Sequence, residues 1–196
     1  VILNDPDLLA KIARDMVEHY EKRIEEGSTV LGKAMIVCSS RSIAWNLYQA
    51  IIHLRPEWAE IKECIEGETL SEKERKEIKP MPRIAMVITR DKDNDSDELY
   101  NLLGNDEYRK MLDKQFKEEK SNFKIAIVVD MWITGFDVPS LDTMYCFKPL
   151  QMHTLIQTIS RVNRVYPGKE KGLVVDYLGI KQQMNEALHQ YGGNGD

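Results

Sequence analysis

Apolar residues occur along the chain in two patterns, as short apolar runs and as longer stretches with the helical period. The short runs predict buried strands at residues 33–38, 83–89, 124–129, 141–147 and 172–175. The periodic stretches predict helices at residues 5–26, 41–54, 108–119, 151–162 and 180–191. Because strands alternate with helices, we expect an α/β fold with a mainly parallel central sheet and helices on its faces.

The first predicted helix has a clear beginning and a clear end. Asp5 can cap it, and Gly27 stops it. Its apolar residues form one stripe, which predicts packing against another element. We therefore expect residues 1–30 to form a flanking helix packed on a sheet domain that spans residues 31–180. Residues 181–196 are expected to form a C-terminal helix with a frayed end.

Two charge-rich stretches interrupt this pattern. Residues 55–82 predict a surface insertion or helix, and the run EKERKE within them is typical of a solvated face. The acidic run at residues 91–98 follows a predicted strand. It lacks the central Gly and the distal Glu that a calcium loop requires. We interpret it as an acidic loop and predict no metal site.

Composition and length add bounds to this picture. The 196 residues suit one domain, and 42% hydrophobic with 30% charged residues is an ordinary globular composition. No apolar run is long enough to predict a membrane span, and the start lacks the basic head and apolar core of a signal peptide. Because the chain begins without Met, we expect it to be part of a longer protein.

Charge and cysteine content bear on partners and compartment. The net charge of −5 leaves two interpretations open, a solvated acidic surface or local contact with DNA that continues on a neighbouring domain. The three cysteines Cys38, Cys64 and Cys146 are far apart and odd in number, which argues against a disulfide framework. Cys38 and Cys146 lie in apolar runs, so buried free thiols are expected. A reducing cytoplasm fits this usage.

The first candidate for chemistry is the polar cluster Thr134-Gly135-Phe136-Asp137, which follows the predicted strand 124–129. Ligands gather at the carboxyl ends of parallel strands, so we expect the cluster at that edge. Thr134 can donate a hydroxyl to a phosphate, and Gly135 permits a conformation that other residues resist. Asp137 can accept from a ribose hydroxyl or hold an arginine in place. A turn that caps a helix is the alternative interpretation.

A second cluster runs from Gln157 to Arg164, at the end of the predicted helix 151–162. Arg161 and Arg164 are three residues apart and therefore neighbours on one helical face. Two guanidinium groups on one face repel, so an anion is a natural partner, and the planar fork of arginine suits phosphate. A pair of solvent-facing or salt-bridged arginines is the alternative.

A third candidate lies at the start of the predicted helix 41–54. Ser39 and Ser40 come directly after a predicted strand, and Arg41 follows them. Unpaired backbone N–H groups with two hydroxyls suit a phosphate. Plain helix capping explains the same residues equally well.

The order of these clusters resembles a known family. Thr134, Gly135, Asp137 and Pro139 resemble motif V, and Gln157 with its two arginines resembles motif VI, of superfamily 2 helicases and translocases. Ser160 and Asn163 stand where that family usually has glycine. Together with residues 33–41 and 172–178, the clusters make the chain most similar to the motor region of the R subunit of type I restriction–modification enzymes.

The resemblance implies a RecA-like three-layer sandwich that acts as the second motor lobe of an ATP-dependent DNA translocase. It implies that Arg161 and Arg164 reach the γ-phosphate, that Gln157 positions the nucleotide or the attacking water, and that Gly135 and Asp137 contact the nucleotide. It also assigns nucleic-acid backbone contacts to one further set of residues, which are Ser39, Ser40, Arg41 and Thr134.

Cofactors and partners follow from the same resemblance. The sequence holds no GxxxxGK[ST] loop, so ATP and Mg²⁺ would be bound jointly with a first RecA-like lobe. That lobe and a nuclease domain would belong to the same longer chain, and the partners would be double-stranded DNA and the modification and specificity subunits. Two other readings stay open: the same lobe of another DNA or RNA helicase, and a non-catalytic α/β binding module.

Overall fold

A five-stranded parallel sheet forms the centre of the structure, a computed structural model that describes residues 3–129 and 137–179. The strand order is β2-β3-β1-β4-β5, and every pairing is parallel. The elements in chain order are α1 (Pro6–Glu25), β1 (Ala34–Cys38), α2 (Arg41–Leu54), the 3-10 helix η1 (Pro56–Ala59), α3 (Glu72–Glu77), β2 (Ile84–Val87), α4 (Asp97–Leu103), α5 (Asp106–Lys117), β3 (Ile125–Val128), β4 (Thr143–Phe147), α6 (Met152–Val162) and β5 (Leu173–Asp176).

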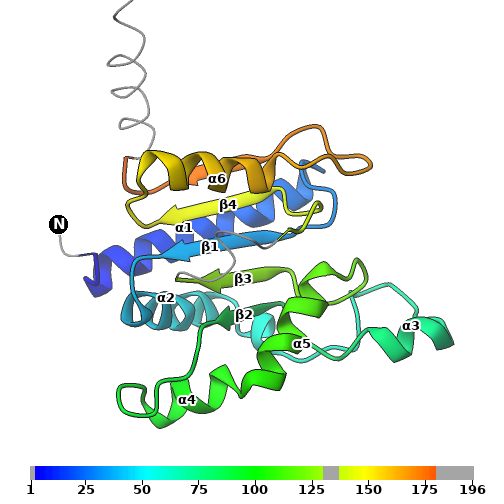
Figure 1. Ribbon diagram of the computed structural model, residues 1–196, viewed down its shortest axis with the longest axis horizontal. Coiled ribbons are helices and arrows are strands. Elements are labelled where there is room, and N and C mark those ends of the chain that lie inside the picture. Colours follow the sequence, from blue (N-terminus) through cyan, green and yellow to red (C-terminus); the bar gives the residue numbers. More distant parts are fainter. Residues whose placement is uncertain (1–2, 130–136, 180–196) are drawn as a thin grey trace, which may run out of the picture.

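Helices cover both faces of this sheet, which gives three layers (Figure 1). Successive residues of a strand point to opposite faces, and β1 shows the consequence. Ile36 packs in a cluster with α1 and α2, whereas Met35 and Val37 pack in a second cluster with α5 and α6. Both faces of the strand are therefore buried, which explains its continuous apolar sequence. The expected α/β sandwich with a parallel sheet is confirmed.

The flanking helix α1 is fixed by its cap and by its apolar stripe. The Asp5 side chain accepts a hydrogen bond from the backbone N–H of Leu8 at 3.0 Å. The stripe packs on the same face of the sheet as α2. Polar contacts add to this, since the Tyr20 hydroxyl donates to the carbonyl of Gly32 and His19 bonds the hydroxyl of Tyr145. Helix α1 is therefore part of the sandwich.

The charged insertion between α2 and β2 contains η1 and α3. Helix α3, whose sequence is EKERKE, begins with a capping box between Ser71 and Glu74, and none of its residues is buried. This agrees with the predicted solvated face. The acidic run differs from expectation at its end: Ser96 caps α4, so Asp97 and Glu98 form the first turn of a helix. Carboxylates are favourable at that position because of the helix dipole.

The two cysteines in the strands lie in the core of the fold. Cys38 and Cys146 are free and buried, and burial raises the pKa of each thiol to about 12. They are therefore protonated core residues, as expected. Among the described residues, no helix has the length and apolar character to cross a membrane. The predicted helix at residues 180–191 lies outside the described part.

Lys33, directly before β1, is completely buried, and burial of its amino group costs desolvation free energy. Its Nζ donates to the carbonyl of Phe123 at 2.7 Å and lies 5.1 Å from the centre of the Phe116 ring. Burial, with a smaller effect of Lys124, lowers the pKa of Lys33 well below its usual value. The fold therefore favours the neutral amine.

This burial predicts a pH-dependent difference between the wild-type chain and Lys33→Met. In the window between the lowered folded pKa and the unfolded value near 10.5, the unfolded state binds more protons, so wild-type stability rises with pH by up to about 1.4 kcal/mol per unit. Urea unfolding at pH 7, 8 and 9 should show that the free energy of unfolding of the wild type, relative to that of Lys33→Met, increases with pH. Lys11→Met, at an exposed position on α1, is the control. A constant difference across these pH values would contradict the assignment.

Candidate functional site

The connection from β3 to β4 determines where the first polar cluster lies. The chain leaves β3 at the carboxyl edge of the sheet and re-enters at Thr143, at the amino edge, because the two strands are parallel. Thr134 and Gly135 lie outside the described residues. Asp137 directly precedes a turn in which the N–H of Leu141 donates to the carbonyl of Val138 at 2.9 Å. This turn leads into β4.

Asp137 therefore lies toward the amino edge, and the expectation that its cluster gathers at the carboxyl edge is wrong for this residue. The physical reason is the length of the crossover. A connection between parallel strands must traverse the sheet, and residues late in that connection reach the opposite edge from residues early in it.

Helix α6 brings the second cluster to the same edge. It begins after the carboxyl end of β4 and ends beside the start of β5, where the N–H of Gly172 donates to Oδ1 of Asn163 at 3.3 Å. Gly172 packs so tightly here that a Cβ atom would lie 2.1 Å from the carbonyl oxygen of Val162. Arg164 therefore meets Asp137, and their ion pair is 3.0 Å long.

The Arg164–Asp137 pair is solvent-exposed on both sides. The two side chains are 53% and 42% exposed. Such pairs contribute about 0–1 kcal/mol because water screens them. The pair therefore orients the guanidinium but binds it only weakly. A phosphate could replace the carboxylate as its partner at little cost in free energy.

Arg161 lies one turn earlier on α6 and is partly buried. Its Nε is buried and has no hydrogen-bond partner among the described residues. A buried donor left without an acceptor costs about 1–3 kcal/mol. Gln157, one turn before it, is exposed. The second cluster therefore has one exposed arginine, one partly buried arginine whose Nε has no acceptor among the described residues, and an exposed amide.

The two residues that replace the usual glycines are accommodated locally. The Ser160 hydroxyl donates to the carbonyl of Gln157 at 2.6 Å, within the helix. The Asn163 side chain accepts from Gly172, as described above, and thereby holds the loop that follows α6. Neither substitution disturbs the helix.

The third candidate cluster lies at the carboxyl edge, away from Arg164. The Ser40 hydroxyl accepts from the N–H of Ile43 at 3.2 Å, as an N-cap does, and the Ser39 hydroxyl donates to the carbonyl of Phe147 at 3.1 Å. Arg41 pairs with Asp95 at 2.6 Å. Each of the three side chains has a protein partner, so capping accounts for Ser40, and backbone contact with nucleic acid stays a prediction for the cluster.

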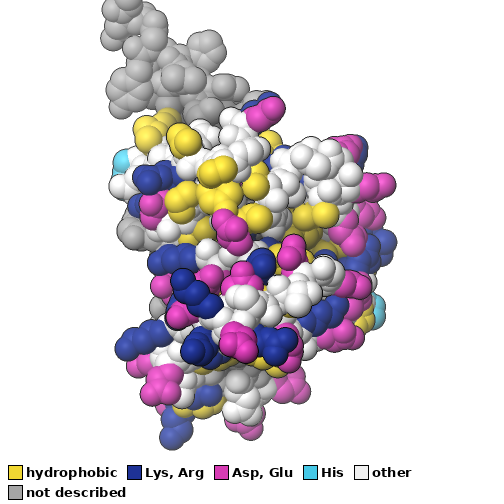
Figure 2. Space-filling view, turned by 90° about the vertical axis from the view of Figure 1, so that its right-hand side faces the viewer, with side chains coloured by type: hydrophobic (Ala, Val, Ile, Leu, Met, Phe, Trp, Pro, Cys, Tyr) yellow, Lys and Arg dark blue, Asp and Glu magenta, His cyan; other side chains and the backbone are white. Residues whose placement is uncertain are grey.

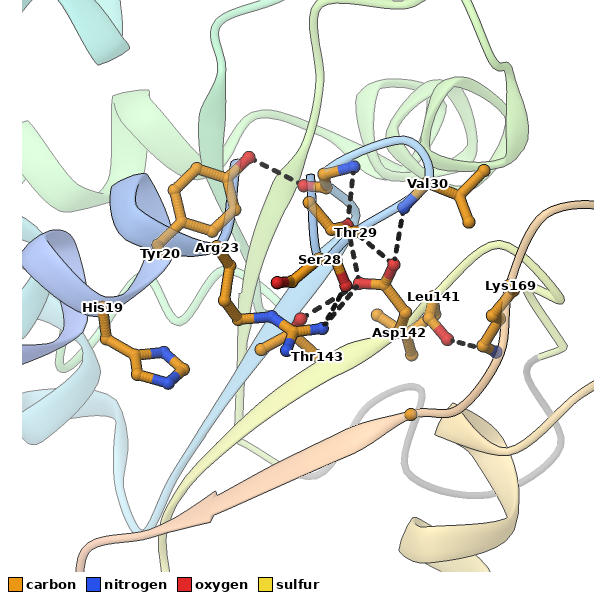
Figure 3. Close-up of polar contacts among 12 residues, drawn as sticks. His19, Tyr20, Arg23, Ser28, Thr29, Val30, Leu141, Asp142, Thr143 and Lys169 are labelled. Carbon is orange, nitrogen blue, oxygen red and sulfur yellow. Dashed lines mark hydrogen bonds and ion pairs between the residues drawn. The ribbon is translucent and has the colours of Figure 1, made fainter. Parts of the chain in front are cut away.

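Sequence reasoning missed a buried polar network at the amino edge (Figure 3). Its centre is Asp142, whose side chain is 1% exposed. The carboxylate accepts from the Thr29 hydroxyl at 2.6 and 2.8 Å, the Val30 N–H at 3.0 Å and the Thr143 hydroxyl at 3.0 Å. The Arg23 guanidinium lies 3.9 Å away. The one signal in the sequence was an acidic residue inside an apolar run.

Lys169 joins this network to the loop that carries Arg164. Its Nζ donates to the carbonyls of Pro139 at 3.0 Å and Leu141 at 2.9 Å. Burial lowers the pKa of Lys169, and Asp142 opposes this effect. A cavity of about 420 Å³ lies between the α1–β1 turn and this loop, with Arg23, Asp142 and Lys169 among its lining residues.

The surface at the amino edge is mixed in character. Figure 2 faces this edge and shows apolar side chains gathered over its upper part, with Lys, Arg, Asp and Glu interspersed below. Val165, directly after Arg164, is 95% exposed, and Ile156 on α6 is 59% exposed. Large apolar side chains are therefore exposed on the segments that bear the candidate arginines.

Comparison with solved structures defines the class of the fold. A fragment of a putative HsdR subunit of a type I restriction enzyme from Vibrio vulnificus YJ016 superposes with a TM-score of 0.61 at 14% identity, over 93% of this chain and 28% of that one. Domain 2 of the DEAD-box helicase Mss116p, bound to an RNA duplex, superposes with a TM-score of 0.54 at 18% identity, over 93% of this chain and 56% of that one. The chain has the fold of a RecA-like helicase domain.

Sequence comparison then gives the family. Residues 32–179 match the model of type I restriction enzyme subunit R domain 3. A putative MjaIXP endonuclease subunit from Methanocaldococcus jannaschii is 37% identical over 97% of the chain, and the HindI endonuclease subunit from Haemophilus influenzae is 36% identical over 97%. The chain belongs to the type I restriction enzyme R subunit family, as its motifs indicated. It spans 16% of the length of both relatives.

Proposed function

We propose that this chain is the second motor lobe of an ATP-dependent DNA translocase within a type I restriction endonuclease R subunit. The observation that carries the proposal is the pairing of Arg164 with Asp137 across two loops at the amino edge. A guanidinium held at the surface by a weak, exposed pair is free to exchange its carboxylate for a phosphate.

The nucleotide would lie between this surface and a first RecA-like lobe. Arg164 and Arg161 would stabilise charge on the γ-phosphate, which for an arginine finger is worth about 10³ to 10⁵ in rate. Arg161 suits the role because its buried Nε lacks an acceptor within the described residues. Gln157, exposed on the same helix, would position the nucleotide or the water. Gly135 and Asp137 would contact the nucleotide.

ATP and Mg²⁺ would be bound jointly by the two lobes. No group of three or more His, Cys, Asp or Glu side chains in residues 3–129 and 137–179 could hold a metal ion. The exposed apolar side chains of Ile156 and Val165 would be covered when the lobes close, since exposed apolar surface beside polar groups is typical of an interface.

Double-stranded DNA would be the translocated substrate, with backbone contacts from Ser39, Ser40, Arg41 and Thr134. A nuclease domain of the same chain and the modification and specificity subunits would be the further partners. The names of the relatives, which are endonuclease subunits of type I restriction enzymes, support this assembly.

The proposal predicts that the 196-residue chain alone does not hydrolyse ATP. The full natural chain that contains it should hydrolyse ATP, and duplex DNA should stimulate this more than duplex RNA does. The measurement is phosphate release with and without each nucleic acid, with the partner subunits present. Turnover by the 196-residue chain alone, or none in the full assembly, would contradict the proposal.

A further inference from the structure

The loop between α6 and β5, residues 163–172, carries Arg164 and is held at its two ends. At the helix end, the Asn163 side chain accepts from the N–H of Gly172 at 3.3 Å. Within the loop, the N–H of Lys169 donates to the carbonyl of Tyr166 at 3.0 Å, which forms a turn. These contacts shape the loop, but neither of them joins it to the connection that bears Asp137.

Among the described residues, two side chains of the loop make polar contacts with that connection, and these contacts differ in strength. The Asp137–Arg164 pair is 42% and 53% exposed, so water and salt weaken it. The ammonium of Lys169 is partly buried and donates to two carbonyl oxygens, of Pro139 and Leu141. Hydrogen bonds from a charged, partly buried donor are stronger than an exposed ion pair that water screens. Lys169 therefore provides the stronger link between the two loops.

The carbonyls that Lys169 binds are themselves fixed to the core. They belong to the turn that leads into β4, and Asp142 follows it directly. The Asp142 carboxylate is held by Thr29 and Val30 of the α1–β1 turn. Its backbone N–H donates to the carbonyl of Lys33, and its carbonyl accepts from the N–H of Leu173. The turn at residues 138–141 is thus fixed to the core, and it fixes the position of the Lys169 ammonium that binds its carbonyls.

We propose that Lys169 is a positioning residue for Arg164: by holding the turn after Asp137 against the loop after α6, it sets where the Arg164 guanidinium lies relative to the bound nucleotide. This inference rests on the proposed function of Arg164. Lys169 does not touch the nucleotide. Its removal leaves the arginine present but displaced, which acts on the rate of the chemical step more than on ATP binding.

The test uses the full natural chain with its partner subunits and measures DNA-stimulated ATP hydrolysis. Lys169→Met should lower kcat by about 10- to 100-fold, as a displacement of about 1 Å can do, with KM for ATP changed less than about twofold. Lys169→Arg, which keeps donors for both carbonyls, should restore much of the loss. Lys171→Met, an exposed lysine of the same loop, should behave as wild type.

A double-mutant cycle separates positioning from an independent role. In an Arg164→Ala background, Lys169→Met should lower kcat by less than about a further twofold, because residues that act as a unit are not additive. The same fold loss in both backgrounds would overturn the inference. Wild-type turnover in Lys169→Met, with turnover lost in Arg164→Ala, would overturn it and leave the proposed function standing. Unchanged turnover in Arg164→Ala would overturn both the positioning role of Lys169 and the proposed function of Arg164.

Hydrogen exchange gives a readout that does not depend on turnover. In Lys169→Met, amides of residues 137–142 and 163–172 should exchange faster, while those of β1 and α1 keep their protection. Loss of protection across β1 would show general unfolding and would overturn a local role for Lys169.

Discussion

Arg164→Ala in the full natural chain is expected to lower DNA-stimulated ATP turnover by about 10³-fold or more, with ATP binding nearly kept. The reason is that its guanidinium would meet charge that develops on the γ-phosphate only as the reaction proceeds, so its loss affects kcat rather than ground-state binding. Arg161→Ala is expected to behave in the same way. The measurements are steady-state hydrolysis and equilibrium binding of a non-hydrolysable ATP analogue.

Two further variants make this prediction specific. Arg164→Lys keeps the charge but loses the planar fork, so it should fall between wild type and Arg164→Ala. Arg14→Ala, at an exposed position of α1, should leave turnover unchanged. If Arg164→Ala hydrolyses ATP at the wild-type rate, the Arg164–Asp137 pair is a structural contact and the binding-module interpretation gains support.

Asp142→Ala is expected to destabilise the chain by about 3–5 kcal/mol, the usual cost of removing one partner from a buried charged network. The substitution leaves the Val30 N–H and the hydroxyls of Thr29 and Thr143 without their acceptor. It also leaves the largely buried Arg23 side chain, 14% exposed, without its nearest carboxylate. Urea unfolding of the 196-residue chain measures the loss.

Asp142→Asn is the matched variant, because it keeps the shape and one acceptor oxygen but not the charge. We expect it to cost less than Asp142→Ala. A loss below about 1 kcal/mol for Asp142→Ala would mean that water replaces the carboxylate readily, and that the network contributes little to the anchoring of the turn before β4.

The sheet could be predicted from the sequence because its physical signal is local. Runs such as residues 124–129 are apolar throughout, and a parallel strand buried on both faces requires that pattern. Helix α4 was missed because its first turn, Asp97 and Glu98, looks like the end of an acidic loop. The capping serine before it is a short-range signal that the run of acidic residues concealed.

The site was harder to predict, because its geometry depends on how the chain crosses the sheet. The pairing of Asp137 with an arginine of the second cluster was one of two roles considered for it, and the structure shows that contact. The sheet edge at which they meet was predicted wrongly. The sequence shows at which edge a connection between strands begins, but it does not show how far along the connection the chain reaches the opposite edge. Asp142 and Lys169 were missed because their partners are mostly backbone groups and residues distant in sequence.

The packing of α1 on the sheet determines where the folded domain begins in the sequence. The match to the family model begins at residue 32, after α1 has ended. Yet the stripe of α1 covers one face of the sheet, including Ile36 and Tyr145. A polypeptide trimmed to the matched segment would expose that face to solvent and would lose the Thr29 hydroxyl from Asp142. We therefore expect the smallest stably folded unit to include α1 and to be longer than the segment that matches the family model.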